Sequence, residues 1–206
     1  DDTWNWDKLR SAALALTKQD DRGRSVQYGL ALEKNKYPMW VNQDGGSVFD
    51  DPLHPTKFTM ASPEGIAAIQ FVADMILKDK SVPSFDAMNQ LGSTTELFST
   101  GRVAMVMTNA ARIPTFAQAS FKWNVAPLPM GPTGIRANSL GGAGYVMSSS
   151  SKHKDAAWTF LKFVSGPEGQ AIFAKPGLAV PAYISPETAE AFASAGPEGV
   201  DRSVFI

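Results

Sequence analysis

The stretch Leu140-Gly141-Gly142-Ala143-Gly144-Tyr145-Val146-Met147-Ser148 places a flexible glycine run directly before a short apolar segment. Glycine adopts backbone conformations closed to other residues and lets a ligand or another segment approach the main chain. The stretch therefore predicts a crossing of the chain that is also a contact surface, followed by a strand at residues 144–148. It does not fit a dinucleotide-binding fingerprint, because the third glycine is absent and the strand follows the glycines instead of preceding them.

Helices and strands alternate on both sides of this stretch. Apolar residues at helical spacing predict a helix over residues 5–18 with Asn5 as its N-cap, and capping signals predict further helices. These further helices begin near residues 62, 93, 113, 151, 165 and 185, the ones at 93 and 165 with capping-box spacing. Alternating or continuous apolar residues predict strands at 26–32, 102–107 and 121–125. This mixture of helices and strands predicts an α/β fold.

Two segments carry more specific expectations. The helix after Ser151 is expected to bury a face made of Ala157, Phe160, Leu161 and Val164. Residues 33–55 are predicted to form an irregular loop, because they hold Tyr37, Trp40 and two adjacent glycines without periodicity. Loops this long are commonly functional, and a loop aromatic such as Trp40 is a candidate ligand contact.

Composition excludes several classes of protein. The chain has 206 residues, no cysteine, and a formal net charge of −1 from 19 Lys and Arg against 20 Asp and Glu. The absence of a basic surplus argues against nucleic-acid binding, and the absence of cysteine rules out disulfides, thiolate nucleophiles and cysteine-ligated metals. No apolar segment is long enough to cross a bilayer, and no signal peptide opens the chain.

The sequence offers no catalytic arrangement. His54 and His153 stand alone without metal-ligand spacing and are expected at the surface, and the serines near His153 lack a nucleophile-elbow motif. Arg112, in the loop after the strand at 102–107, is either a surface ion-pair partner or a polar anchor for a ligand. We therefore expect no catalytic residue, metal or cofactor, and favour a binding protein over an enzyme.

Taken together, several segments resemble the extracellular solute-binding proteins of family 1, which serve ABC importers of sugars and related solutes and include the maltose-binding protein. The characteristic pieces include Leu97-Phe98-Ser99-Thr100-Gly101-Arg102-Val103-Ala104-Met105 and the opening glycine stretch. The matching segments, in family order, are residues 3–9, 12–13, 16–18, 28–30, 45–46, 97–105, 127–129, 140–147, 151–158, 160–163, 168–170 and 177–181. Each match is weak alone, but their common order across nearly the whole chain is specific.

The resemblance implies a bilobed fold of the class II periplasmic-binding-protein type, each lobe a mixed sheet flanked by helices, with ligand in the cleft between the lobes. Residues 1–143 correspond to the second lobe, residues 144–182 to the hinge crossing and returning segment of the first lobe, and residues 183–206 to the start of a C-terminal helical region. The start of the first lobe would precede Asp1. Residues from Gly144 onward are then expected to be the most altered part of this chain.

The resemblance also implies a set of ligand contacts. These are Tyr37 and Trp40 before the Gly-Gly pair, Asn109 and Arg112 after the Ala-Met strand, and Gly142, Ala143 and Gly144 at the hinge. The family often has tryptophan where this chain has Ala111 and Arg112, and an arginine there suits a ligand with an anionic or strongly polar group.

The function implied is capture of a sugar, polyol or sugar phosphate for the membrane subunits of an ABC importer. The implied location is extracytoplasmic, either periplasmic or lipid-anchored on the outer face of the cell membrane through an N-terminal part before Asp1. Two alternatives remain: a carbohydrate-active enzyme domain, and an interaction module whose aromatic residues are purely structural.

Overall fold

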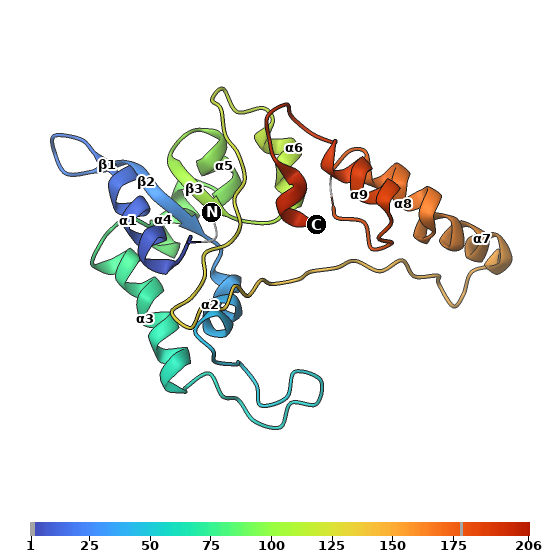
Figure 1. The fold of residues 1–206 in the computed structure, drawn as a ribbon, viewed down its shortest axis with the longest axis horizontal. Helices are drawn as coiled ribbons and strands as arrows, with labels where there is room; N and C mark the ends of the chain where they lie inside the picture. The colour runs from blue at the N-terminus through green and yellow to red at the C-terminus, as the bar shows by residue number, and fades with distance from the viewer. Residues whose placement is uncertain (1–2, 178) are drawn as a thin grey trace. The chain divides into compact units, whose positions relative to one another are not determined.

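The computed structural model describes residues 3–177 and 179–206 (Figure 1), and Leu178 of the 177–181 motif lies outside them. The chain forms two compact units. Unit 1 comprises residues 1–108 and 127–139, and unit 2 comprises residues 109–126 and 140–206. The predicted division into lobes at residues 143 and 144 concerns a complete bilobed protein, and it stays a prediction.

Unit 1 is built on a three-stranded mixed sheet with the order β1-β2-β3. The strands are β1 (Lys18–Gln19), β2 (Ser25–Leu32) and β3 (Val103–Met107). β1 pairs antiparallel with β2, and β2 pairs parallel with β3, with Leu30 opposite Met105 and Leu32 opposite Met107. The predicted strands at 26–32 and 102–107 are therefore confirmed, as is the α/β class with a mixed sheet and flanking helices.

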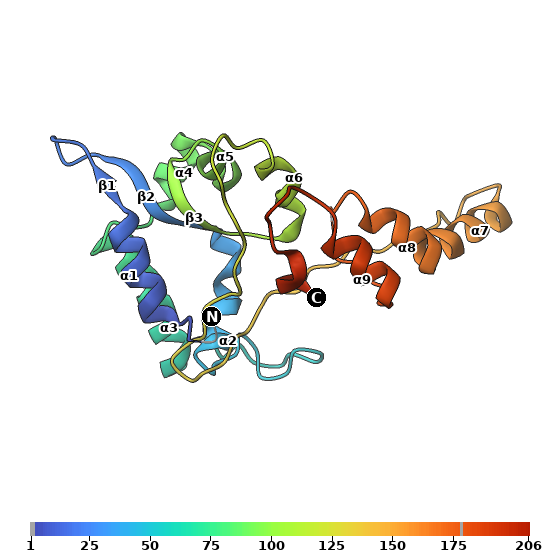
Figure 2. The same cartoon turned by 45° about the horizontal axis from the view of Figure 1, so that its top comes forward.

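Helices cover both faces of this sheet, which is why Leu30, Ala31 and Leu32 are all buried although their side chains alternate in direction. The helices of unit 1 are α1 (Trp6–Leu16), α2 (Tyr37–Gln43), α3 (Pro63–Leu77), α4 (Phe85–Leu91) and α5 (Thr94–Ser99), with a 3-10 turn η1 (Lys34–Lys36). Figures 1 and 2 show α1 and α5 on opposite sides of β2 and β3. The main core lies where α1, α2 and α3 meet the face of the sheet that carries Leu30 and Leu32.

The helix starts follow the local signals. The Asn5 side chain accepts a hydrogen bond from the Lys8 amide, and the Ser62 side chain accepts one from the Gly65 amide. Ser93 forms a complete capping box with Glu96 at the start of α5. These caps satisfy amide groups that have no partner within the helix, so the predicted N-termini of α1, α3 and α5 are confirmed.

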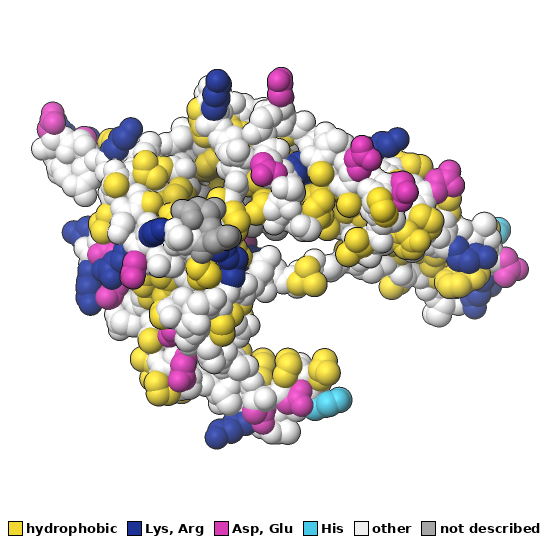
Figure 3. Space-filling model, in the orientation of Figure 1, with side chains coloured by type: hydrophobic (Ala, Val, Ile, Leu, Met, Phe, Trp, Pro, Cys, Tyr) yellow, Lys and Arg dark blue, Asp and Glu magenta, His cyan; other side chains and the backbone are white. Residues whose placement is uncertain are grey.

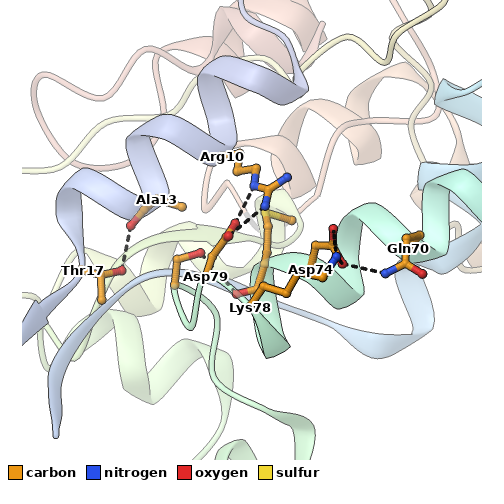
Figure 4. Close-up of polar contacts among 9 residues, drawn as sticks. Arg10, Ala13, Thr17, Gln70, Asp74, Lys78 and Asp79 are labelled. Atoms are coloured by element: carbon orange, nitrogen blue, oxygen red, sulfur yellow. Dashed lines mark hydrogen bonds and ion pairs between the residues drawn. The ribbon is translucent and has the colours of Figure 1, made fainter. Parts of the chain in front are cut away.

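An ion pair joins the two long helices of unit 1. The Arg10 guanidinium of α1 donates two hydrogen bonds to Asp79, just after α3, at 2.5 and 2.8 Å (Figure 4). These hydrogen bonds raise the pKa of Arg10. On α3 itself, Gln70 and Lys78 both donate to Asp74, and these bonds lower the pKa of that carboxyl group. Since Arg10 and Asp79 bind through two parallel bonds, the pair fixes the orientation of α1 relative to α3 as well as their distance.

The prediction of an irregular loop across residues 33–55 is wrong for its first part. Residues 34–43 form η1 and α2, and Pro38 occupies the first turn of α2, where its missing amide hydrogen has no cost. Met39, Trp40 and Gln43 lie at helical spacing and all are buried. This short helix forms because Met39 and Trp40 pack into the core of unit 1. The residues next to it in sequence do not reveal that contact.

Unit 2 consists of short helices. They are η2 (Ala110–Arg112), α6 (Ile113–Phe116), α7 (Lys154–Ser165), α8 (Pro167–Ala174), α9 (Pro186–Ala193) and η3 (Arg202–Phe205). The predicted helices near residues 113, 151, 165 and 185 are confirmed, and the Ser185 cap of α9 is complete. The capping box predicted at Ser165 is wrong, because Gly166 is the N-cap of α8 and gives no side-chain hydrogen bond.

Two predicted strands are absent from the structure. Residues 121–125 and 144–148 form neither helix nor strand, and Val146 is 90% exposed. A strand needs a neighbour that satisfies its backbone amide and carbonyl groups, and the sheet of unit 1 contains only β1, β2 and β3. The apolar pattern of these segments is therefore not sufficient to make them strands in this chain.

The face predicted to be buried on α7 is only partly covered. No residue of α7 is fully buried: Ala157, Leu161 and Val164 are half-buried, and Phe160 is 62% exposed. Hydrophobic side chains consequently lie open on the surface over α7 to α9 (Figure 3). The helix forms as its sequence predicts, but its contact with α8 covers the apolar face only in part.

Candidate functional site

The carboxyl ends of the two parallel strands in unit 1 bring polar side chains together. Glu33 follows β2 and Thr108 follows β3, and the Thr108 hydroxyl donates a hydrogen bond to Glu33 Oε1 at 3.0 Å. In open α/β sheets, ligands bind outside the carboxyl ends of the strands. This edge of unit 1 is therefore the first place to look for a binding site.

A pocket of about 360 Å³ opens beside Glu33, a volume within the range of small-molecule sites. Its walls come from the end of β2, from α4, and from the turn between α4 and α5. The lining residues are Leu32, Glu33, Lys34, Phe85, Met88, Asn89, Gly92, Ser93 and Thr94. All of them belong to unit 1, so the pocket is complete within one compact body.

The pocket combines an apolar wall with a few polar groups. Phe85 and Met88 provide the wall, and Met88 is only 9% exposed. The polar groups of Ser93 are already used in the capping box of α5, because its backbone N–H and its hydroxyl both donate hydrogen bonds to the Glu96 carboxylate. The hydrogen bond from the backbone N–H is the main reason that the pKa of Glu96 is lowered. This arrangement leaves Glu33 as an acceptor, and Lys34, Asn89 and the Thr94 hydroxyl as further groups able to contact a polar solute.

Such a set fits reversible binding of a hydroxylated molecule. A carboxylate accepts hydrogen bonds from hydroxyl groups, an ammonium and an amide donate them, and an aromatic wall packs against carbon-bound hydrogens. Among the described residues no group of three or more His, Asp or Glu side chains could hold a metal ion. In the same residues, no helix is long and apolar enough to cross a membrane.

Of the two aromatic residues predicted as ligand contacts in unit 1, only Tyr37 is accessible. Tyr37 begins α2 and is 40% exposed, whereas Trp40 is 2% exposed. The Trp40 ring packs against Trp6 at 5.5 Å and Phe71 at 5.8 Å between ring centroids. Trp40 therefore has a packing role, and a direct contact with ligand stays a prediction for both residues.

Asn109 and Arg112 lie on one 3-10 turn at the start of unit 2. The Asn109 side chain accepts a hydrogen bond from the Ala111 amide at 3.1 Å, so it caps the turn. Arg112 is exposed and forms no ion pair among the described residues. Asn109 and Arg112 thus lie at the two ends of the same short turn, η2. Their contact with a ligand stays a prediction.

Gly142, Ala143 and Gly144 are exposed in an extended segment of unit 2. A Cβ atom added at Gly142 or Gly144 would meet no atom within 4 Å, and neither glycine has a positive φ. Neither crowding nor backbone geometry within this chain therefore requires glycine at these positions. Their predicted role as hinge and ligand contacts stays a prediction.

Sequence analysis missed Glu33, Lys34, Asn89 and Thr108. Glu33 and Thr108 each follow directly after a correctly predicted strand, so the rule for carboxyl ends of parallel strands could have found them. That rule requires knowing that the two strands are parallel neighbours, which follows from the register of β2 with β3 and not from the sequence.

The family described as bacterial extracellular solute-binding protein matches residues 1–171. Among curated proteins, a putative binding protein of Brucella abortus (strain 2308) is 25% identical over 190 residues. That alignment covers 82% of this chain and 41% of the relative, so the chain spans about two fifths of the length of the curated relatives it matches.

Solved structures agree with this match. The ABC substrate-binding protein Lmo0181 from Listeria monocytogenes, in complex with cycloalternan, has a TM-score of 0.80 and 27% identity, covering 98% of this chain and 50% of that chain. Maltose-bound MalE3 of T. maritima has a TM-score of 0.69 and 26% identity, covering 91% of this chain and 50% of that chain. The chain thus has the fold of about half of each of these sugar-binding proteins.

Proposed function

Because the chain belongs to the family of bacterial extracellular solute-binding proteins, we propose that it is part of a receptor that captures a sugar or related polar solute for an ABC importer. The observation that carries this proposal is the pocket of unit 1 at the carboxyl end of β2. It holds the Glu33 acceptor, the donors Lys34, Asn89 and Thr94, and an apolar wall, a set that suits a sugar ring.

Within this proposal, Glu33 is the main polar contact of unit 1. Its carboxylate is held by Thr108, so it is preorganised to accept a second hydrogen bond from a solute hydroxyl group. Tyr37 adds an exposed ring, and Trp40 supports α2 from the core. Asn109, Arg112 and the segment from Gly142 to Gly144 are proposed as the contacts from the remainder of the chain.

The lobe assignment is part of the same proposal. We assign residues 1–143 to the second lobe, residues 144–182 to the returning segment of the first lobe and residues 183–206 to the start of a C-terminal helical region. The exposed apolar side chains of α7 support this assignment, since Trp158, Phe160 and Phe163 are 56%, 62% and 45% exposed. Several large apolar side chains exposed on one helix are typical of a surface that another protein surface covers.

The family also supports a proposal for location and partners. We propose an extracytoplasmic protein, periplasmic or lipid-anchored on the outer face of the membrane, that delivers solute to the membrane subunits of the importer. The relatives are described as binding proteins, which supports binding without catalysis over a carbohydrate-active enzyme. The candidate pocket also holds no histidine and no second carboxylate beside Glu33 to form an acid-base pair.

A thermal-shift screen of the protein at its full natural length tests the proposal. Maltose and cycloalternan are the first probes, followed by other oligosaccharides, polyols and sugar phosphates. A ligand present at 100 times its Kd stabilises the native state by about 2.7 kcal/mol, which is easily measured as a rise in Tm. No rise with any member of the panel, or hydrolysis of a sugar during the assay, would contradict the proposed function.

A further inference from the structure

The chain passes between the two units three times, at residues 108/109, 126/127 and 139/140. The unit 1 side of each passage is fastened by hydrogen bonds. Thr108 binds Glu33 at the first, and Met130 exchanges backbone bonds with Trp4 and Trp6 near the second. Near the third, the Gln43 side-chain amide donates to the Ala137 carbonyl at 2.8 Å.

Gln43 is an unusual residue for this position because it is a fully buried polar side chain, 0% exposed. Its Oε1 accepts a hydrogen bond from Trp6 Nε1 at 2.7 Å while its Nε2 donates to Ala137. The side chain thus uses both halves of its amide on segments 37 and 94 residues away in sequence. A buried amide with both halves bonded specifies one arrangement of its partners, since any other would leave polar groups without a partner.

The backbone of Gln43 fastens the same crossing segment. Its carbonyl accepts a hydrogen bond from the Thr133 hydroxyl at 2.9 Å. A Cβ atom added at Gly131 would lie 2.0 Å from that carbonyl oxygen, so the segment approaches Gln43 as closely as only glycine allows. Residues 131–139 form neither helix nor strand; the Gly131 and Gly134 amides bond within the segment, to the carbonyls of Ile135 and Gly131, and the contacts with Gln43 attach this turn to α2.

We propose that Gln43 is a positioning residue that fixes the third passage of the chain, the one leading to the Gly141–Gly144 run, to the end of α2, the helix that continues directly from the η1 turn at the candidate pocket. Glu33 immediately precedes η1 and Gln43 is the last residue of α2, and each holds the unit 1 end of one passage. A displacement of α2 on one side is thereby transmitted to Ala137 on the other. The role of Gln43 in holding the chain follows from the hydrogen bonds alone. Its consequence for ligand binding rests on the proposed function.

Hydrogen-deuterium exchange of the ligand-free protein tests the proposal. Gln43→Met keeps the length of the side chain and removes both of its hydrogen bonds, and Gln70→Met on the exposed surface of α3 is the matched control. We expect Gln43→Met to accelerate exchange of the Gly131 and Gly134 amides at least tenfold, with the amides of β2 and β3 changed less than twofold. Equal acceleration throughout unit 1, or none at Gly131 and Gly134, would overturn the proposal.

A milder variant keeps the proposal testable if Gln43→Met does not fold. Thr133→Val removes only the bond to the Gln43 carbonyl and is expected to accelerate the same two amides to a smaller extent. No effect of Thr133→Val on the Gly131 and Gly134 amides would contradict the assignment.

A second exchange experiment with maltose as the probe separates this inference from the proposed function. If maltose raises the Tm, it is expected to slow exchange at Gly131 and Gly134 in the wild type and less so in Gln43→Met. Equal slowing in both proteins would overturn the coupling. Failure of maltose to bind would count against maltose as the solute and leave the ligand-free result as the test of Gln43.

Discussion

Replacing Trp40 by alanine separates a structural aromatic residue from a ligand-binding one. Trp40 is 2% exposed and packs against Trp6 and Phe71 in the core of unit 1. A tryptophan buries roughly 200 Å² of surface, which at about 25 cal/mol per Å² corresponds to about 5 kcal/mol. Measured losses for emptying an aromatic core position are about 3–5 kcal/mol, so we expect Trp40→Ala to lower the free energy of unfolding of unit 1 by that amount.

Tyr37→Ala is the matched control on the same helix. Tyr37 is 40% exposed, and the expected loss of stability is below about 1 kcal/mol. For a chain of this size, about 1 kcal/mol shifts Tm by roughly 2–4 °C, so the two variants should differ by several degrees. Urea unfolding followed by far-UV circular dichroism measures both. A loss below 1 kcal/mol for Trp40→Ala, or equal losses for the two variants, would refute the packing role of Trp40.

Three further predictions concern single positions. Gly29→Ala is expected to destabilise unit 1 by several kcal/mol because the new Cβ would lie 1.8 Å from the Ala13 carbonyl oxygen, whereas Gly141→Ala meets no atom within 4 Å and should leave Tm unchanged; equal Tm values would contradict this. Burial raises the pKa of Asp44 above its ordinary value of 3.8, so the folded state holds the proton more tightly than the unfolded state. The free energy of unfolding therefore falls as the pH rises from this ordinary value through the raised pKa of the folded state. Asp44→Asn should therefore raise Tm at pH 7 and lose its advantage below the ordinary value, and an advantage that grows on acidification would contradict this sign. Arg202 is 1% exposed, two of its guanidinium nitrogens have no hydrogen-bond partner, and burial lowers its pKa. Arg202→Met fills the same space without a charge and is expected to leave Tm nearly unchanged, whereas Arg202→Ala leaves a cavity and is expected to cost roughly 2–5 kcal/mol. A larger loss of stability for Arg202→Met than for Arg202→Ala would contradict this expectation.

Local signals in the sequence were sufficient for the long helices and for the two parallel strands β2 and β3, but not for the short strand β1. Asn5, Ser62 and Ser93 each cap the helix that they were expected to begin, because a cap depends on residues only two or three positions away. The strands at 26–32 and 102–107 follow their apolar pattern, and the glycine-rich family segments identified the fold. These features are set by neighbours along the chain.

Features that depend on distant contacts were missed or wrong. Residues 144–148 have the pattern of a strand but no neighbouring strand, and the apolar face of α7 is covered only in part within unit 2. Conversely, α2 forms because the core accepts Met39 and Trp40. The Glu33–Thr108 pair arises from the parallel register of β2 and β3, which no local pattern encodes.

The central claim is that the carboxyl edge of β2 binds the transported solute through Glu33. The most direct test is titration calorimetry of the protein at its full natural length with the sugar that gives the largest thermal shift. Loss of one hydrogen bond to a charged group costs about 1.5–3 kcal/mol, so Glu33→Ala is expected to weaken binding roughly tenfold or more, while Glu190→Ala on the exposed side of α9 leaves it unchanged. Binding of the same affinity to wild type and Glu33→Ala would contradict the account.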